Sequence, residues 1–90
     1  MVREIIPKYI RREHILEALK KIDEEGIPPK RQSRKYYLVY NGKYYPPKYV
    51  VSIANAIATG EELDPKVFNG GRETNIFLKK LGFKVVQFSP

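Results

Sequence analysis

The segment KYYLVYNGKYYPP, residues 35–47, constrains the fold more than any other part of the chain. Asn41 and Gly42 separate two short runs rich in Tyr, Val and Leu, which are residue types that favour strands. An Asn-Gly pair readily adopts the two positive φ angles of a type I′ turn, whose twist matches that of paired strands. We therefore predict a β-hairpin with strands over 36–40 and 43–45.

Helical patterns flank this hairpin. Pro46 and Pro47 end the second strand and favour a helix start, because a proline at the first helical position loses no hydrogen bond. That helix is expected over 47–58, and its predicted buried stripe consists of Val50, Ile53, Ala54 and Ile57. Apolar residues at helical spacing predict two further helices, over 11–25 and 72–81.

The remaining segments complete the predicted fold. The sequence FKVVQF at 83–88 alternates well enough to add a third strand to the hairpin. The predicted class is α+β, with three helices packed on a small antiparallel sheet made of the hairpin and the C-terminal strand. A winged-helix-like arrangement is one way to close it, although the link of about ten residues between the last two helices is longer than a helix-turn-helix turn. Within that link we expect Leu63, Val67 and Phe68 to contact the core.

The length and charge limit the function classes. Ninety residues suffice for one hydrophobic core, so we predict a single domain over 1–90 and no large enzyme active site. The formal net charge is +7, and residues 1–50 hold 12 basic against 6 acidic side chains. Between Pro29 and Tyr49 there is no Asp or Glu, and six of the seven tyrosines are interleaved with the basic residues. This combination favours a nucleic-acid partner, but the same tyrosines also suit half-buried strand positions beside lysines that keep a sheet edge soluble.

Three sets of residues are candidates for contacts with nucleic acid. The first set is the basic and tyrosine-rich segment, which would contact phosphates through Lys30, Arg31, Arg34, Lys35, Lys43, Tyr45 and Lys48. The second is a polar face of the second helix, on which Ser52 and Asn55 follow Lys48 at helical spacing. The third is a patch on the last helix made of Arg72, Asn75 and Lys79, close to a Gly70-Gly71 pair that suits either a backbone anion site or a tight turn. Ordinary solvation is the competing interpretation for Ser52, Asn55 and Asn75.

Several kinds of chemistry have no support in the sequence. There is no Cys, His14 is the single imidazole, and the nucleotide-binding and nucleophile motifs are missing, so we expect no metal, no cofactor and no catalysis. No signal peptide or membrane-spanning stretch is recognisable, which predicts a soluble, cytoplasmic protein without a membrane partner. High charge without Cys also fits a thermophilic source.

One string resembles a known family: GKYYPPKYVVSIANAIATGEELDPKVFNGGRETNIFLKKLGF. It is similar to the amino-terminal head domain of McrA-type modification-dependent restriction endonucleases, and Tyr45-Pro46-Pro47-Lys48 is its most distinctive part. The similarity spans about residues 9–87 and implies a DNA-associated accessory module. Because the sequence ends at Pro90 without HNH-type histidines, the resemblance implies the head alone, acting as a free-standing binder or with a separate protein.

The favoured hypothesis is therefore a non-catalytic DNA-binding protein, with duplex DNA as its partner and no small-molecule substrate. One alternative is a protein-interaction module in which the tyrosine-rich hairpin docks a nuclease or another DNA-processing protein. Another is a binder of RNA or single strands that uses exposed tyrosines for stacking. The sequence does not decide between duplex DNA and RNA.

Overall fold

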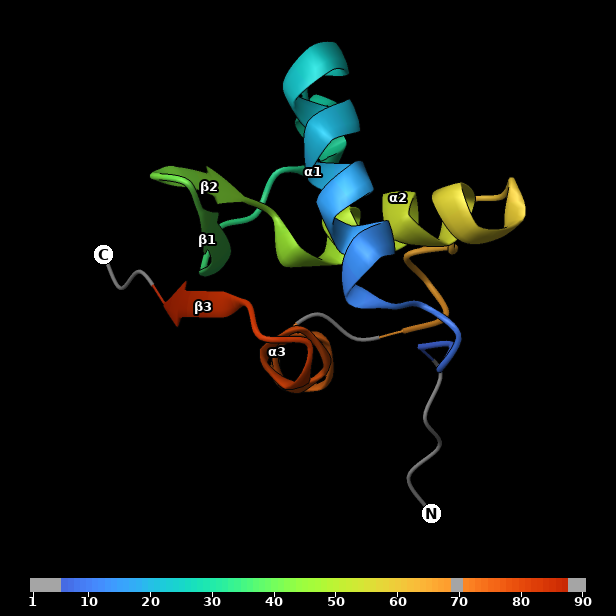
Figure 1. The fold of residues 1–90 in the computed structure, drawn as a ribbon. Helices are drawn as coiled ribbons and strands as arrows, with labels where there is room; N and C mark the ends of the chain where they lie inside the picture. The colour runs from blue at the N-terminus through green and yellow to red at the C-terminus, as the bar shows by residue number, and fades with distance from the viewer. Residues whose placement is uncertain (1–5, 69–70, 88–90) are drawn as a thin grey trace.

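The computed structural model describes residues 6–68 and 71–87 (Figure 1). Within these residues the chain forms three α-helices, one 3-10 turn and three strands, which confirms the predicted α+β class. Their order is α1 (Arg12–Glu25), η1 (Pro29–Arg31), β1 (Tyr36–Tyr40), β2 (Lys43–Tyr45), α2 (Pro47–Thr59), α3 (Arg72–Lys80) and β3 (Lys84–Gln87). Phe88, which was predicted to extend the last strand, lies outside the described residues. The winged-helix-like arrangement stays a prediction.

The sheet is antiparallel and has the order β2-β1-β3. Asn41 and Gly42 connect β1 and β2 with φ angles of 50° and 75°, so the predicted type of turn is confirmed. Leu38, at the middle of β1, lies opposite Tyr45 on one side and Val85 on the other. These three residues belong to the face of the sheet that contributes to the core.

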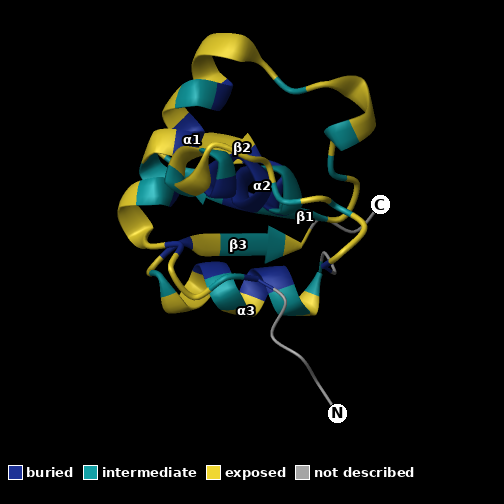
Figure 2. Ribbon diagram, turned by 90° about the vertical axis from the view of Figure 1, so that its right-hand side faces the viewer, coloured by how far each residue is buried: buried dark blue, intermediate teal, exposed yellow. Residues whose placement is uncertain are grey.

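The core lies between this sheet face and the helices (Figures 1 and 2). In Figure 1 the strands lie together on the left, α1 and α2 cross to their right, and α3 lies below them. The core side chains of α1 recur at helical spacing, as predicted, and are Ile15, Ala18, Leu19 and Ile22. They face Val50, Val51, Ile53 and Ala54 of α2, and α3 adds Leu78.

Two predicted core contacts are wrong. Ile57 is 39% exposed, because the last turns of α2 extend away from the sheet in Figure 1, whereas Val51 in the first half is fully buried. Val67 is also exposed, because a turn closed by its N–H on the Asp64 carbonyl directs the next residue, Phe68, into the core. None of the helices among the described residues has the length and apolar character needed to span a membrane.

Candidate nucleic-acid interface

A groove of about 380 Å³ lies beside the first turn of α2. Residues 30–36 form one wall, the β2–α2 junction at 46–49 forms another, and Pro65 and Gly71 complete the lining. Among the residues that the structure describes, no Asp or Glu lines it, and its basic side chains are Lys30, Arg31, Arg34, Lys35 and Lys48. We call it the basic groove. Several like charges around one concave surface focus a positive potential that attracts polyanions.

Hydrogen bonds at several positions hold the wall formed by residues 30–36 in place. Arg31 donates its backbone N–H to the Pro28 carbonyl at 2.9 Å, which closes the 3-10 turn. The Ser33 hydroxyl donates to the Tyr36 carbonyl, and the Tyr37 hydroxyl donates back to the Ser33 carbonyl at 2.7 Å. In Figure 2 this part of the chain is the largely exposed arch between α1 and β1. The residues between these anchors, Lys30, Arg34 and Lys35, are exposed.

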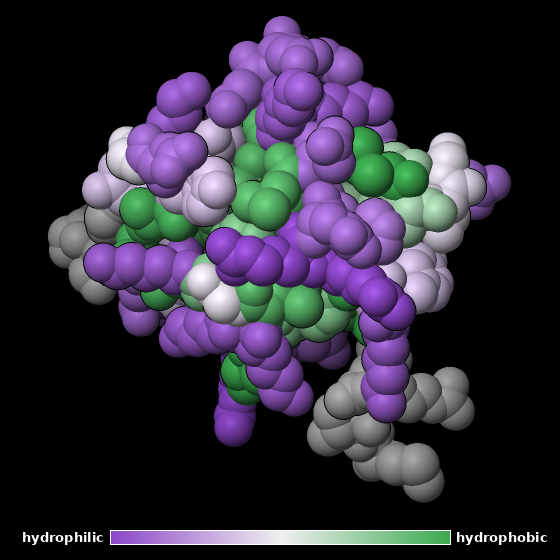
Figure 3. Space-filling view, viewed as in Figure 1, coloured by the Kyte–Doolittle hydropathy of each residue, from purple (hydrophilic) through white to green (hydrophobic). Residues whose placement is uncertain are grey.

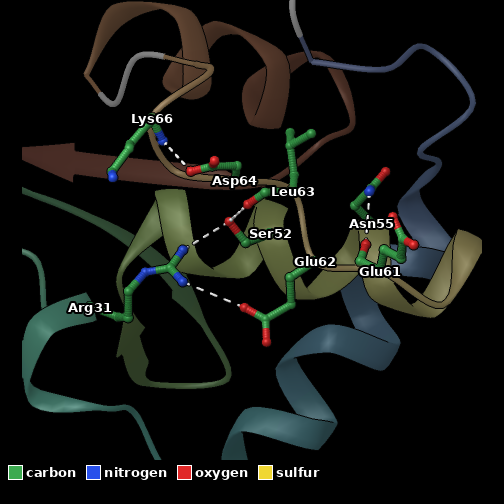
Figure 4. A network of polar contacts seen from close by, with 8 residues as sticks. All are labelled: Arg31, Ser52, Asn55, Glu61, Glu62, Leu63, Asp64 and Lys66. Carbon is green, nitrogen blue, oxygen red and sulfur yellow. Dashed lines mark hydrogen bonds and ion pairs between the residues drawn. The ribbon is translucent and has the colours of Figure 1, made fainter.

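Arg31 has a structural role in the basic groove (Figure 4). Its Nη2 donates to Ser52 Oγ at 2.9 Å, and its Nη1 lies 3.4 Å from Glu62 Oε1. The guanidinium also lies over the Tyr49 ring, 4.8 Å from the centroid. Arg31 thereby joins the 3-10 turn, α2 and the following loop. That it also contacts a phosphate stays a prediction.

Two lysines of the basic groove are positioned by aromatic rings. Lys35 Nζ lies 5.5 Å from the Tyr36 ring centroid, and Lys48 Nζ lies 5.1 Å from that of Phe68. Such contacts limit the motion of a long side chain without neutralising its charge. Lys30 and Arg34 make no hydrogen bond or ion pair within residues 6–68 and 71–87. Among the described residues, Arg31 is thus the one basic side chain of the groove that is paired with a carboxylate.

Three other predicted cations lie outside the basic groove. Lys43 follows the hairpin turn, where its Nζ is 3.5 Å from Asp23 Oδ1. Arg72 and Lys79 are exposed on α3 and do not belong to the groove lining. Gly71 does line the groove, but Gly70 lies outside the described residues, so the Gly70-Gly71 anion site stays a prediction.

The predicted exposed polar face of α2 is wrong. Ser52 and Asn55 are 0% and 6% exposed, because the loop after α2 folds back over them. Ser52 Oγ donates to the Leu63 carbonyl at 2.8 Å, and Asn55 Nδ2 donates to the Glu61 carbonyl at 2.9 Å (Figure 4). These side chains provide hydrogen bonds that the loop backbone would otherwise lack. They belong to the scaffold of the site and not to its surface.

Tyr45 and Asn75 are also buried, at 3% and 7% exposure, against the prediction of a surface position. Tyr45 points into the core because it pairs with Leu38 on the inner sheet face, and its hydroxyl donates to Asp23 Oδ1 at 2.8 Å. Burial, together with this carboxylate, raises the pKa of Tyr45 to about 12. Asn75 lies on the buried face of α3, beside Thr74 and Leu78.

The sequence interpretation missed two tyrosines that line the basic groove. Tyr36 begins β1, and a Cβ at Gly71, on the same lining, would lie 3.5 Å from its ring. Tyr49 lies in the first turn of α2 below Arg31, and its pKa is raised by burial and then by the nearby Glu62. Both belong to the noted pattern of interleaved tyrosines, but that pattern does not separate these half-buried residues from Tyr45 in the core. Among the described residues, no three His, Asp or Glu side chains gather as metal ligands.

Comparison with known families places this groove in context. The family of ScoMcrA-like N-terminal head domains matches residues 8–87 of the chain, which is nearly its whole length. The chain belongs to this family. The resemblance drawn from the sequence is therefore confirmed, and it concerns the head domain of McrA-like restriction endonucleases, whose catalytic HNH domain is separate. No curated protein and no solved structure matches the chain.

Proposed function

We propose that this head domain is a non-catalytic DNA-binding module whose basic groove contacts the phosphate backbone. The observation that carries the proposal is a groove whose described lining has five basic side chains and no carboxylate. Membership of a restriction-endonuclease family supports DNA as the partner, since these enzymes act on DNA. Duplex DNA is the form that we propose.

The proposed contacts are mainly electrostatic. Lys30, Arg34 and Lys35 are exposed, and Lys48 is half-buried at the opposite wall. When such side chains neutralise phosphates, counterions are released and affinity falls with rising salt. Phosphate contacts fix position without reading sequence. Because Ser52, Asn55 and Asn75 are buried, we expect little sequence preference from these three amides and hydroxyls.

The test is a fluorescence-anisotropy titration of labelled duplex DNA, single-stranded DNA and an RNA hairpin at several salt concentrations. A triple variant, Lys30→Ala, Arg34→Ala and Lys35→Ala, should bind duplex DNA more weakly, and its log–log salt slope should fall by up to about three. The matched control removes three exposed lysines outside the groove, Lys20, Lys80 and Lys84, and lowers the net charge equally.

The control distinguishes the groove from the overall charge of the protein. If both triple variants lose the same affinity and slope, the groove is not the binding surface. If the native protein binds none of the three nucleic acids at low salt, the proposal of DNA binding fails. A clear preference for RNA or single strands would replace duplex DNA as the partner.

A second candidate, docking of a protein partner, is supported by the outer face of the sheet. Tyr44 is 53% exposed and meets Tyr37 edge-to-face, with 6.2 Å between ring centroids. On the face seen in Figure 3, hydrophilic side chains predominate and apolar ones form separate patches, so no broad apolar surface supports this candidate there. A Tyr44→Ala variant should leave duplex affinity unchanged. If this variant abolishes binding of a purified nuclease partner, protein docking is better supported than DNA binding.

A further inference from the structure

The size of the basic groove suits a single nucleotide. Its volume, about 380 Å³, lies near the lower end of the roughly 300–1,000 Å³ typical of sites for small ligands. The groove is therefore larger than one phosphate group requires and too small to enclose a duplex. One nucleotide of a strand is a ligand of suitable size for it.

The charge of the groove exceeds what one internal phosphate of a strand supplies. Of the five basic side chains, Arg31 alone is paired with a carboxylate among the described residues, through Glu62. Four positive charges thus remain around a space for one nucleotide. An internal phosphodiester carries one negative charge, whereas a phosphomonoester carries about 1.5 to 2 near neutral pH. A phosphomonoester therefore neutralises more of the positive charge of the groove than an internal phosphodiester does.

The remaining lining is apolar or aromatic and suits the rest of a nucleotide. Pro46, Pro47 and Pro65 contribute rigid apolar surface, and Tyr36 and Tyr49 contribute rings. Stacking or packing on such rings stabilises a base with little dependence on its identity. Aromatic rings also position Lys35 and Lys48. These two side chains therefore lose less conformational entropy when they bind a phosphate.

We propose that the basic groove binds the terminal phosphomonoester of a DNA strand, so that this head domain recognises phosphorylated strand ends. The inference rests on the proposed DNA binding and narrows its ligand. Lys30, Arg34, Lys35 and Lys48 bind the terminal phosphate, while the tyrosine and proline walls contact the last sugar and base. A free nucleoside monophosphate has the same chemistry, and the experiment separates it from a strand end.

The experiment compares single-stranded DNA of one sequence, about 12 nucleotides long, with an internal fluorophore. One form carries a 5′-phosphate, one a 3′-phosphate, and one only hydroxyl ends. At equal ionic strength, native protein should bind one phosphorylated form about tenfold more tightly than the hydroxyl form, because a charge-assisted contact is gained. The double variant Arg34→Gln and Lys35→Gln should remove this ratio. The matched control, Lys80→Gln and Lys84→Gln, should retain it.

Each other outcome overturns a defined statement. Equal affinity for all three forms overturns strand-end recognition and leaves the proposed DNA binding intact. If the protein binds none of the three single-stranded forms and no duplex DNA, strand-end recognition and the proposed DNA binding are both wrong. Competition with deoxyadenosine monophosphate tests whether the ligand is a free nucleotide. If this nucleotide displaces the labelled phosphorylated strand as effectively as the unlabelled phosphorylated strand does, the ligand is a free nucleotide, and the proposal of strand-end recognition is wrong.

Discussion

At the scale of single residues, Tyr45 shows how a side chain from a cationic segment becomes part of the core. Its hydroxyl donates to Asp23, and Asp23 also pairs with Lys43, so strand β2 is tied to the end of α1. We expect Tyr45→Phe to lower the free energy of unfolding by about 1 kcal/mol at neutral pH, because one hydrogen bond to a carboxylate is lost. Urea unfolding followed by circular dichroism measures this change, with Tyr44→Phe at an exposed position as control.

The same residue predicts a dependence on alkaline pH. The pKa of Tyr45 is raised from 10.0 to about 12, so the neutral phenol is favoured more in the folded than in the unfolded chain. Its contribution is complete below pH 10 and is lost as pH rises toward 12. Native protein should therefore lose more stability over this interval than Tyr45→Phe does. The titration of Tyr49 affects native protein and Tyr45→Phe alike, so it cancels in this comparison. Equal losses of stability in the two proteins would therefore contradict the burial of Tyr45 and its hydrogen bond to Asp23.

Gly82 provides a second prediction at this scale. Its φ is +90°, and a Cβ there would lie 2.8 Å from Nη1 of Arg12, the group that donates to the Leu81 carbonyl at the end of α3. We expect Gly82→Ala to destabilise by about 1 to 2 kcal/mol, from backbone strain and displacement of Arg12.

The control for this prediction is Gly42→Ala, where φ is also positive but the space is open. Thermal unfolding should show the larger loss for Gly82→Ala. In an Arg12→Ala background the two glycine substitutions should become similar in cost. If Gly82→Ala still loses more stability than Gly42→Ala in the Arg12→Ala background, contact with Arg12 is not the cause of the larger loss.

At the scale of elements, α2 organises the loop that follows it. Ser52 accepts a hydrogen bond from Arg31 and donates one to Leu63, and the Leu63 N–H bonds back to the Ser52 carbonyl at 3.3 Å. We expect Ser52→Ala to lower the free energy of unfolding by about 1 to 3 kcal/mol, because a donor on Arg31 and an acceptor on Leu63, both half-buried, lose their partner. Hydrogen exchange at the Leu63 amide should also become faster.

The matched control in this loop is Lys66→Ala. The backbone N–H of Lys66 bonds to Asp64, and this bond does not need the lysine side chain. Exchange at Leu63 should remain as in the native protein. If Ser52→Ala also leaves both stability and exchange unchanged, the loop is held by its apolar contacts alone, through Leu63 and Phe68.

At the scale of the whole molecule, the three helices and the sheet share one core, and Leu38 lies at its centre. It is fully buried on the middle strand between Tyr45 and Val85. Leu38→Ala should cost about 2 to 5 kcal/mol, a large part of the roughly 5 to 15 kcal/mol that stabilises a typical domain. Val39→Ala, at a half-buried position on the outer face, should cost less.

Unfolding monitored in the near and far ultraviolet tests whether the core is one unit. For native protein and for Leu38→Ala we expect coincident transitions, because the buried apolar residues that the structure describes form one cluster. Transitions that separate in Leu38→Ala would show that the sheet and the α1–α2 pair unfold independently.

Local sequence patterns determined the elements of this protein. The Asn41-Gly42 turn, the prolines before α2 and the apolar spacing of α1 and α3 predicted bounds that differ from the structure by a residue or so. These features depend on backbone geometry and neighbouring side chains, which a sequence states directly. The interleaving of tyrosines with basic residues likewise indicated the segment that forms one wall of the groove.

Only the tertiary structure decided which polar residues reach the surface. Ser52 and Asn55 follow Lys48 at a spacing that suits a solvated face, yet a loop folds over that face and its carbonyls take their hydrogen bonds. Tyr36 and Tyr45 lie on the same face of the sheet, because Tyr36 is two residues before Leu38 and Tyr45 is opposite Leu38. Tyr45 nevertheless enters the core, whereas Tyr36 lines the groove. Burial and convergence depend on which distant segments meet, because backbone groups of one segment satisfy side chains of another. The pattern within a single segment does not contain that information.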